Sequence, residues 1–100
     1  MPLDLSAEDL TTVRSILRTH VPQAEVYAFG SRTTGRARPF SDLDLLIVDQ
    51  VALPLPLRGD LLQAFSESRV PFRVDIVDGR SASSDFLASL GRNDANRVYP

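Results

Sequence analysis

Apolar residues recur along this chain at two spacings, which predict alternating helices and strands. Helical spacing of three and four residues marks three segments, and short apolar runs typical of strands fall between them. The helices are expected over 6–19, 57–68 and from Ser84 onward, and the strands over 25–29, 42–49 and 72–77. This order predicts an α/β domain of the α+β type, in which a small mixed β-sheet carries helices on one side.

Proline residues and turn signals separate the predicted elements. Pro22 prevents the first helix from continuing, and a proline-interrupted linker over 50–56 precedes the second helix. The tail, 93–100, is expected to be loosely held, although Val98 and Tyr99 are available for packing. The chain therefore shows no internal boundary, and we expect a single domain over 1–100.

Length and charge narrow the classes of protein to consider. One hundred residues supply a modest core and little room for a second domain that would hold a substrate. The formal net charge of -2 argues against direct nucleic-acid binding, because phosphate binding draws on clustered positive charge. The local cluster of Arg32, Arg36 and Arg38 remains a candidate for contact with a few phosphates or with a protein partner.

Two missing residue types exclude several chemistries. The chain contains no cysteine, so it has neither disulfides nor thiolate metal ligands. It also contains no lysine, which excludes a Walker-type phosphate loop, a kinase lysine and Schiff-base chemistry. The first residues do not resemble a signal peptide, and no apolar run approaches the length of a membrane span. We therefore expect a cytoplasmic protein without a membrane partner.

A glycine–serine turn after the first predicted strand has a chemical use. Gly30 lacks a Cβ atom, so its backbone can approach a ligand closely. Ser31 adds a hydroxyl group beside backbone N–H groups of the kind that hold phosphate oxygens. This turn predicts half of a nucleotide site, although Ser31 can also be read as a plain turn residue.

The other half of the site is predicted at the second strand. Residues two apart on a strand point to the same face, so the carboxylates of Asp42 and Asp44 should project together. Oxygen ligands of this kind are the ones that Mg2+ prefers. If the first two strands run antiparallel, their connection brings Ser31 beside these aspartates. Taken alone, however, the pair is also compatible with a turn and a solvent-facing side chain.

The segment from Gly30 to Asp44 resembles the signature of the DNA polymerase beta-like nucleotidyltransferase superfamily. That signature is a Gly-Ser pair followed, after a loop, by Asp-x-Asp, here Gly30-Ser31 and Asp42-Leu43-Asp44. The superfamily needs a third carboxylate on a later strand, and Asp75 fits that position. More narrowly, the chain is similar to the minimal nucleotidyltransferases, small proteins often encoded beside a HEPN-domain partner as antitoxin and toxin.

This resemblance implies a fold, a reaction and roles for individual residues. It implies the minimal nucleotidyltransferase fold, with two Mg2+ ions held by Asp42, Asp44 and, for one of them, Asp75. Gly30, Ser31 and Arg32 would contact the bound nucleotide, with ATP as substrate, and Asp75 would be nearest the attacking hydroxyl. The implied reaction joins AMP to an acceptor hydroxyl on a HEPN-type toxin partner, and the chain would act as the antitoxin.

Two other functions stay open at this point. One is nucleotidyl transfer to a small molecule such as an aminoglycoside, which would need an acceptor pocket formed by a dimer. The other is an antitoxin that neutralises its partner by binding alone. Intact carboxylates count against the second function, because an acidic cluster is unfavourable to keep without a cation. Asp78, by contrast, is predicted to form a turn rather than to bind a metal.

Overall fold

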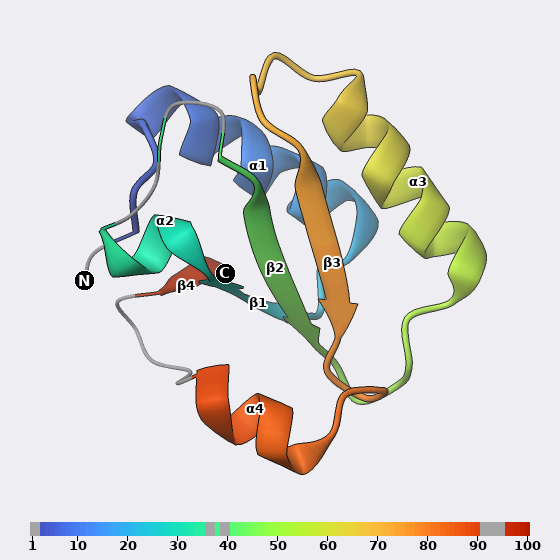
Figure 1. Ribbon diagram of the computed structural model, residues 1–100. Coiled ribbons are helices and arrows are strands. Elements are labelled where there is room, and N and C mark those ends of the chain that lie inside the picture. Colours follow the sequence, from blue (N-terminus) through green and yellow to red (C-terminus); the bar gives the residue numbers. More distant parts are fainter. Residues whose placement is uncertain (1–2, 36–37, 39–40, 91–95) are drawn as a thin grey trace.

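The protein is described by a computed structural model that covers residues 3–35, 38, 41–90 and 96–100 (Figure 1). Helices and strands alternate along the chain, as the apolar spacing predicts. The elements are α1 (Ala7–His20), β1 (Glu25–Phe29), α2 (Ser31–Thr34), β2 (Leu43–Val48), α3 (Leu55–Ser66), β3 (Val74–Asp78), α4 (Ser84–Leu90) and β4 (Arg97–Tyr99). In the described part of the chain, no helix is long and apolar enough to cross a membrane.

The strands form one mixed sheet in the order β3-β2-β1-β4. The pair β1 and β2 is antiparallel, β2 and β3 are parallel, and β4 pairs antiparallel with the other edge of β1. The small mixed sheet predicted from the sequence is thereby confirmed, and the antiparallel pairing of the first two strands, which the sequence left as a condition, is found. The antiparallel connection brings the end of β1 next to the beginning of β2, where the predicted site residues lie.

One face of the sheet is covered by α1 and α3, and the main core lies between this face and the two helices. Alternate residues of β2, namely Leu43, Leu45 and Ile47, are fully buried against these helices. Leu17 of α1 and Phe65 of α3 belong to the same core. Each such buried side chain contributes roughly 1.5–3 kcal/mol by leaving water. The alternation leaves the intervening residues of β2, Asp44 among them, on the opposite face.

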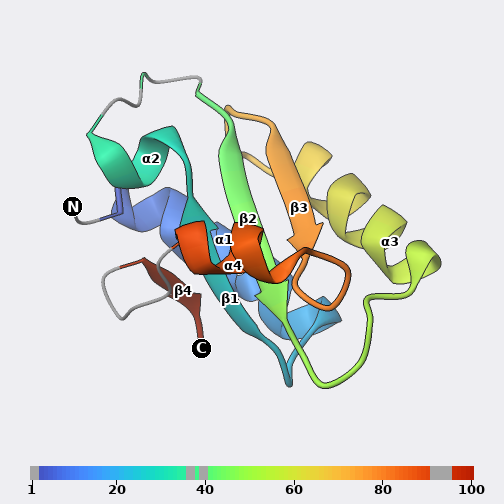
Figure 2. The ribbon, with the colours of Figure 1, turned by 60° about the horizontal axis from the view of Figure 1, so that its bottom comes forward.

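The expectation that the helices lie on one side of the sheet is wrong for α4. Figure 2 shows α4 in front of the sheet, whereas α1 lies behind it. The ring of Phe86 in α4 meets the ring of Phe29 edge-on, with the centroids 6.0 Å apart. Phe29 points away from the main core because it alternates with the buried Ala28. This aromatic residue on the second face gives α4 a place to pack.

The expectation of a loosely held tail is also wrong for residues 96–100, while 93–95 lie outside the described residues. Val98 is fully buried in β4, and Tyr99 donates a hydrogen bond from its hydroxyl to the Pro22 carbonyl, at 3.0 Å. The side chain of the buried Asn96 donates to the Ala28 carbonyl, at 3.0 Å. The open edge of β1 explains this order, because its backbone groups need partners.

Element boundaries differ from the predicted ones by a few residues. The second long helix begins at Leu55 rather than at Leu57, since Pro56 stands in its first turn, where a missing N–H costs nothing. The strand predicted from Asp42 begins at Leu43, and the strand predicted from Phe72 begins at Val74. Asp42 therefore stands just before β2, at the end of the sheet where β2 begins.

Candidate active site

Two of the predicted carboxylates lie side by side near the beginnings of β2 and β3. Asp44 pairs with Phe29 of β1 on one side and with Asp75 of β3 on the other. Side chains of directly paired residues point to the same face, with Cβ atoms about 4.5–5.5 Å apart. Asp44 and Asp75 therefore share the face opposite the main core. The parallel pairing of β2 with β3 is what joins two aspartates that are far apart in the sequence.

The pairing places Asp44 and Asp75 in one row across the sheet, and Gly30 lies directly against this row. It has φ 82° and ψ -154°, a backbone conformation open essentially to glycine alone. A Cβ atom added to Gly30 would overlap the Oδ2 atom of Asp44. The backbone of the turn thus passes within contact distance of a predicted catalytic carboxylate. Ser31 follows as the first residue of the short helix α2, so the turn and the acidic row form one site.

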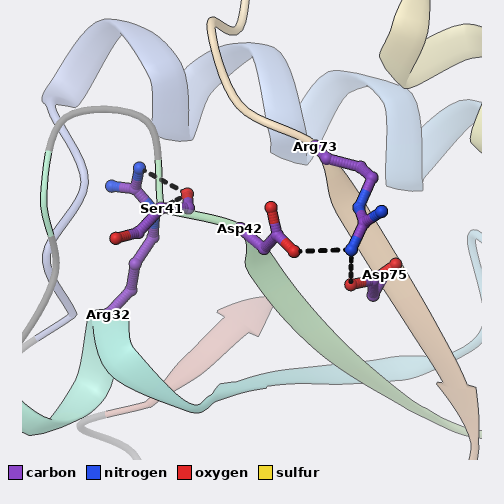
Figure 3. A network of polar contacts seen from close by, with 5 residues as sticks. All are labelled: Arg32, Ser41, Asp42, Arg73 and Asp75. Carbon is purple, nitrogen blue, oxygen red and sulfur yellow. Dashed lines mark hydrogen bonds and ion pairs between the residues drawn. The ribbon is translucent and has the colours of Figure 1, made fainter.

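Asp42 is joined to the row through an arginine (Figure 3). The Nη2 atom of Arg73 lies 2.8 Å from Asp42 Oδ2 and 3.4 Å from Asp75 Oδ2. The Asp42 and Asp75 side chains are 40% and 48% exposed, and that of Arg73 is 72% exposed. The structure therefore brings Asp42, Asp44 and Asp75 to one solvent-accessible end of the sheet.

The electrostatics of Asp44 reflect this crowding. Burial raises the pKa of Asp44 above its ordinary value, and the neighbouring charges of Asp75 and Asp42 raise it further. The cationic Arg73 lowers the pKa of Asp44, but as the smallest of these effects. The three carboxylates thus form a site with an excess of negative charge, which a cation would relieve.

The donor set suits Mg2+, which takes carboxylate oxygens and shares its remaining positions with water and substrate phosphates. Among the described residues, however, no group of three or more acidic, histidine or cysteine side chains stands close enough to hold a metal ion. The Arg73 guanidinium lies between Asp42 and Asp75 and donates a hydrogen bond to each. The carboxylates are assembled at one place but are not drawn together around a common centre.

Arg32 is placed differently from the expectation that it contacts the nucleotide. Only 5% of Arg32 is exposed, and its guanidinium donates to the Ser41 carbonyl, at 2.8 Å, and to the Asp4 carbonyl, at 2.9 Å. It also lies over the ring of Phe72, 4.3 Å from the centroid. Contact with a phosphate stays a prediction. The geometry favours a structural role for Arg32, which ties α2 to the residue preceding Asp42 (Figure 3).

We expect Arg32→Met to lower the free energy of unfolding by roughly 2–4 kcal/mol, because two carbonyls lose a buried charged donor. Arg32→Lys should recover only part of this loss, since an ammonium group cannot fork between Asp4 and Ser41. Urea unfolding measures both, with the exposed Arg69→Met as the matched control. Unchanged stability together with weaker nucleotide binding would instead assign Arg32 to the phosphates.

The sequence also predicts that Asp78 forms a turn and that Arg36 is a candidate for contact with phosphates or a partner. Asp78 accepts hydrogen bonds from the backbone N–H groups of Leu53 and Arg80, at 2.8 and 2.9 Å, which confirms its role in a turn. Arg36 lies outside the described residues. Sequence reasoning missed Arg73, which stands just before β3 and contacts Asp75. The spacing of two residues between Arg73 and Asp75 was the available signal.

Comparison with known proteins finds relatives of this chain. A family model described as nucleotidyltransferase domain matches residues 10–86, which include the Gly30–Ser31 turn and all three carboxylates. The chain is 46% identical over 84 residues to the probable protein adenylyltransferase MntA of Haemophilus influenzae. That match covers 84% of this chain and 74% of the relative.

Two solved structures share the fold. One is a toxin-antitoxin crystal structure with AMP-PNP, with a TM-score of 0.71, 26% identity, and coverage of 90% of this chain and 72% of the other. The second is the tri-AMPylated Shewanella oneidensis HEPN toxin in complex with MNT antitoxin. Its TM-score is 0.66, with 25% identity and coverage of 91% of this chain and 69% of the other.

Proposed function

We propose a function from the premise that the chain belongs to the nucleotidyltransferase domain family, as the match over residues 10–86 shows. The proposed reaction is Mg2+-dependent transfer of AMP from ATP to a hydroxyl group of a HEPN-type toxin, with this chain as the antitoxin. The observation that carries the proposal is the row in which Gly30 contacts Asp44 and Asp44 pairs with Asp75. This row places a turn whose backbone phosphates can approach beside a pair of carboxylates.

The roles of the residues follow from their positions. Bound Mg2+ would neutralise negative charge on the triphosphate and on the leaving pyrophosphate. Asp42, Asp44 and Asp75 would hold it, because theirs are the oxygen donors assembled at this end of the sheet. Gly30 lets the triphosphate approach the backbone closely, and the Ser31 hydroxyl donates a hydrogen bond to a phosphate oxygen.

Bond making and breaking balance in this arrangement. The acceptor hydroxyl oxygen attacks the α-phosphorus atom, and the bond from that atom to the bridging oxygen of pyrophosphate breaks. Asp75 lies on the edge strand β3 and is about half exposed, so an acceptor can reach it from solvent. We assign Asp75 to accept the proton of the attacking hydroxyl. The products are the AMP ester of the acceptor and pyrophosphate.

Two features favour a protein as acceptor over a small molecule. The half-exposed carboxylates of Asp42 and Asp75 open to solvent at the end of the sheet, where a segment of a second protein has access. The similar solved structures carry the corresponding chains in toxin-antitoxin complexes, one of them with an AMPylated HEPN toxin. A small acceptor such as an aminoglycoside would need walls supplied by a further subunit.

The test is label transfer from ATP that carries its label at the α-phosphate. The chain is incubated with Mg2+ and purified HEPN-type toxin, and Asp42→Asn serves as the inactive variant. Label on the toxin that depends on Mg2+ and disappears with Asp42→Asn is the expected result. Tight complex formation without label would replace the proposal with an antitoxin that acts by binding. Label on an aminoglycoside, and none on the toxin, would move the acceptor to a small molecule.

A further inference from the structure

Arg73 is the residue at the site to which no role has yet been given. Its guanidinium donates from one nitrogen, Nη2, to carboxylates on two neighbouring segments, Asp42 before β2 and Asp75 in β3 (Figure 3). The hydrogen bond that Arg73 donates to Asp42, followed by the charges of Asp42 and Asp75, raises the pKa of Arg73. Arg73 therefore carries a permanent positive charge between two of the proposed metal ligands.

The manner in which Arg73 is held differs from that of Arg32. Arg32 is buried and donates to backbone carbonyls, whereas the Arg73 side chain is 72% exposed and reaches carboxylates at the surface. Ion pairs between exposed groups contribute little to stability. The backbone carbonyl of Arg73 accepts from Leu43 N–H at 2.8 Å, and this bond does not depend on the side chain. The guanidinium can therefore move away from the two carboxylates while the beginning of β3 stays folded.

A metal ion and the guanidinium compete for the same oxygens. Mg2+ requires its ligand oxygens at about 2.0–2.1 Å. The Nη2 atom of Arg73 stands 2.8 Å from one carboxylate and 3.4 Å from the other, so it spaces them more widely than a shared Mg2+ would. A metal ion that binds both of these oxygens would take the position of Nη2, so the metal and the guanidinium cannot occupy it together. Binding of the metal must release Arg73 and draw Asp42 toward Asp75.

We propose that Arg73 is an internal counter-ion that occupies the cation position between Asp42 and Asp75 until a metal ion displaces it. This inference rests on the proposed function, because it takes these carboxylates as the metal ligands. It makes Arg73 a positioning residue with two effects. Arg73 offsets carboxylate repulsion in the metal-free protein, and it weakens metal binding by the fraction of the time that it occupies the site.

The experiment titrates Mn2+, as a spectroscopic substitute for Mg2+, into the full chain without nucleotide at low ionic strength, where exposed charges are least screened. Electron paramagnetic resonance reports free Mn2+. Arg73→Met should bind Mn2+ about twofold to tenfold more tightly than the wild type, because its competitor is gone. Arg73→Lys keeps a cation there and should fall between the two. Arg80→Met removes the same charge beyond the far end of β3 and should match the wild type.

A second measurement separates competition from a general change in charge. In chelator, Arg73→Met should unfold at a lower temperature than the wild type, and Mn2+ should then stabilise the variant by more than it stabilises the wild type. Circular dichroism verifies that each variant is folded. Unchanged or weaker Mn2+ binding by Arg73→Met, with a wild type that binds Mn2+, overturns this inference alone. If neither protein binds Mn2+, both the inference and the Mg2+ dependence of the proposed function are wrong.

Discussion

Asp44→Asn should reduce nucleotidyl transfer by roughly a thousandfold or more and at the same time stabilise the metal-free fold at neutral pH. The loss is expected because Asp44 lies between Gly30 and Asp75 and is the central carboxylate of the proposed metal site. Asparagine has the same shape but no charge, so it should remove metal binding without disturbing the packing. Label transfer from ATP and Mn2+ titration measure the two parts of this loss.

The gain in stability follows from the sign of the pKa shift. Burial, Asp75 and Asp42 together raise the pKa of Asp44, so folding favours the protonated form. The stability that this group contributes is fully present below its unfolded pKa, about 3.9, and is lost as pH rises through the higher folded value. At neutral pH, Asp44→Asn avoids that loss. Its advantage should shrink as pH falls through the raised pKa and vanish below about 3.9.

Urea unfolding in chelator at neutral and acidic pH measures this difference. Asp60→Asn removes the same charge from an exposed position of α3, so it is the matched control for both readouts. It should leave label transfer unchanged. If Asp44→Asn kept wild-type transfer, Asp44 would not be a metal ligand. If Asp44→Asn destabilised the protein equally at both pH values, the effect of the change on the free energy of unfolding would not come from the charge of Asp44.

The residues of the candidate site were predictable from the sequence because their chemistry and spacing are local. Strand alternation predicts that Asp44 faces away from the main core, and a short antiparallel connection brings the Gly30 turn beside it, whereas Asp42 lies just before β2. The position of Asp75 needed the resemblance to a family, because periodicity alone does not show which strands pair. Its parallel pairing with Asp44 is a property of the folded sheet.

Features that depend on distant partners were not predictable in the same way. The three-residue strand β4 exists because the edge of β1 accepts it, and nothing in the local pattern at Val98 indicates that edge. Arg32 follows Ser31 directly in the motif, but successive helical residues point about 100° apart. The structure accordingly places Arg32 in the interior. An exposed arginine such as Arg73 gains its meaning only from the two carboxylates that it reaches.

Gly30→Ala should both destabilise the protein and disable the site. The backbone of Gly30 adopts φ 82° and ψ -154°, and an alanine forced into this region costs about 1–3 kcal/mol. The new methyl group would also collide with Asp44 Oδ2. Either the turn or the carboxylate must then move, and a displacement of about 1 Å at a reacting centre costs on the order of a hundredfold in rate. Urea unfolding and label transfer measure the two effects.

A control glycine and a double-mutant cycle separate strain from collision at Gly30. Gly59 lies inside α3, where an added Cβ meets nothing within 4 Å, so Gly59→Ala should stabilise the helix by roughly 0.5–1 kcal/mol. Combining Gly30→Ala with Asp44→Ala removes the atom that the methyl group strikes. If collision dominates, Gly30→Ala should destabilise the Asp44→Ala background less than the wild type. Equal destabilisation in both backgrounds would assign the whole cost to the backbone, and Gly30 would then shape the turn without setting its distance from the carboxylate.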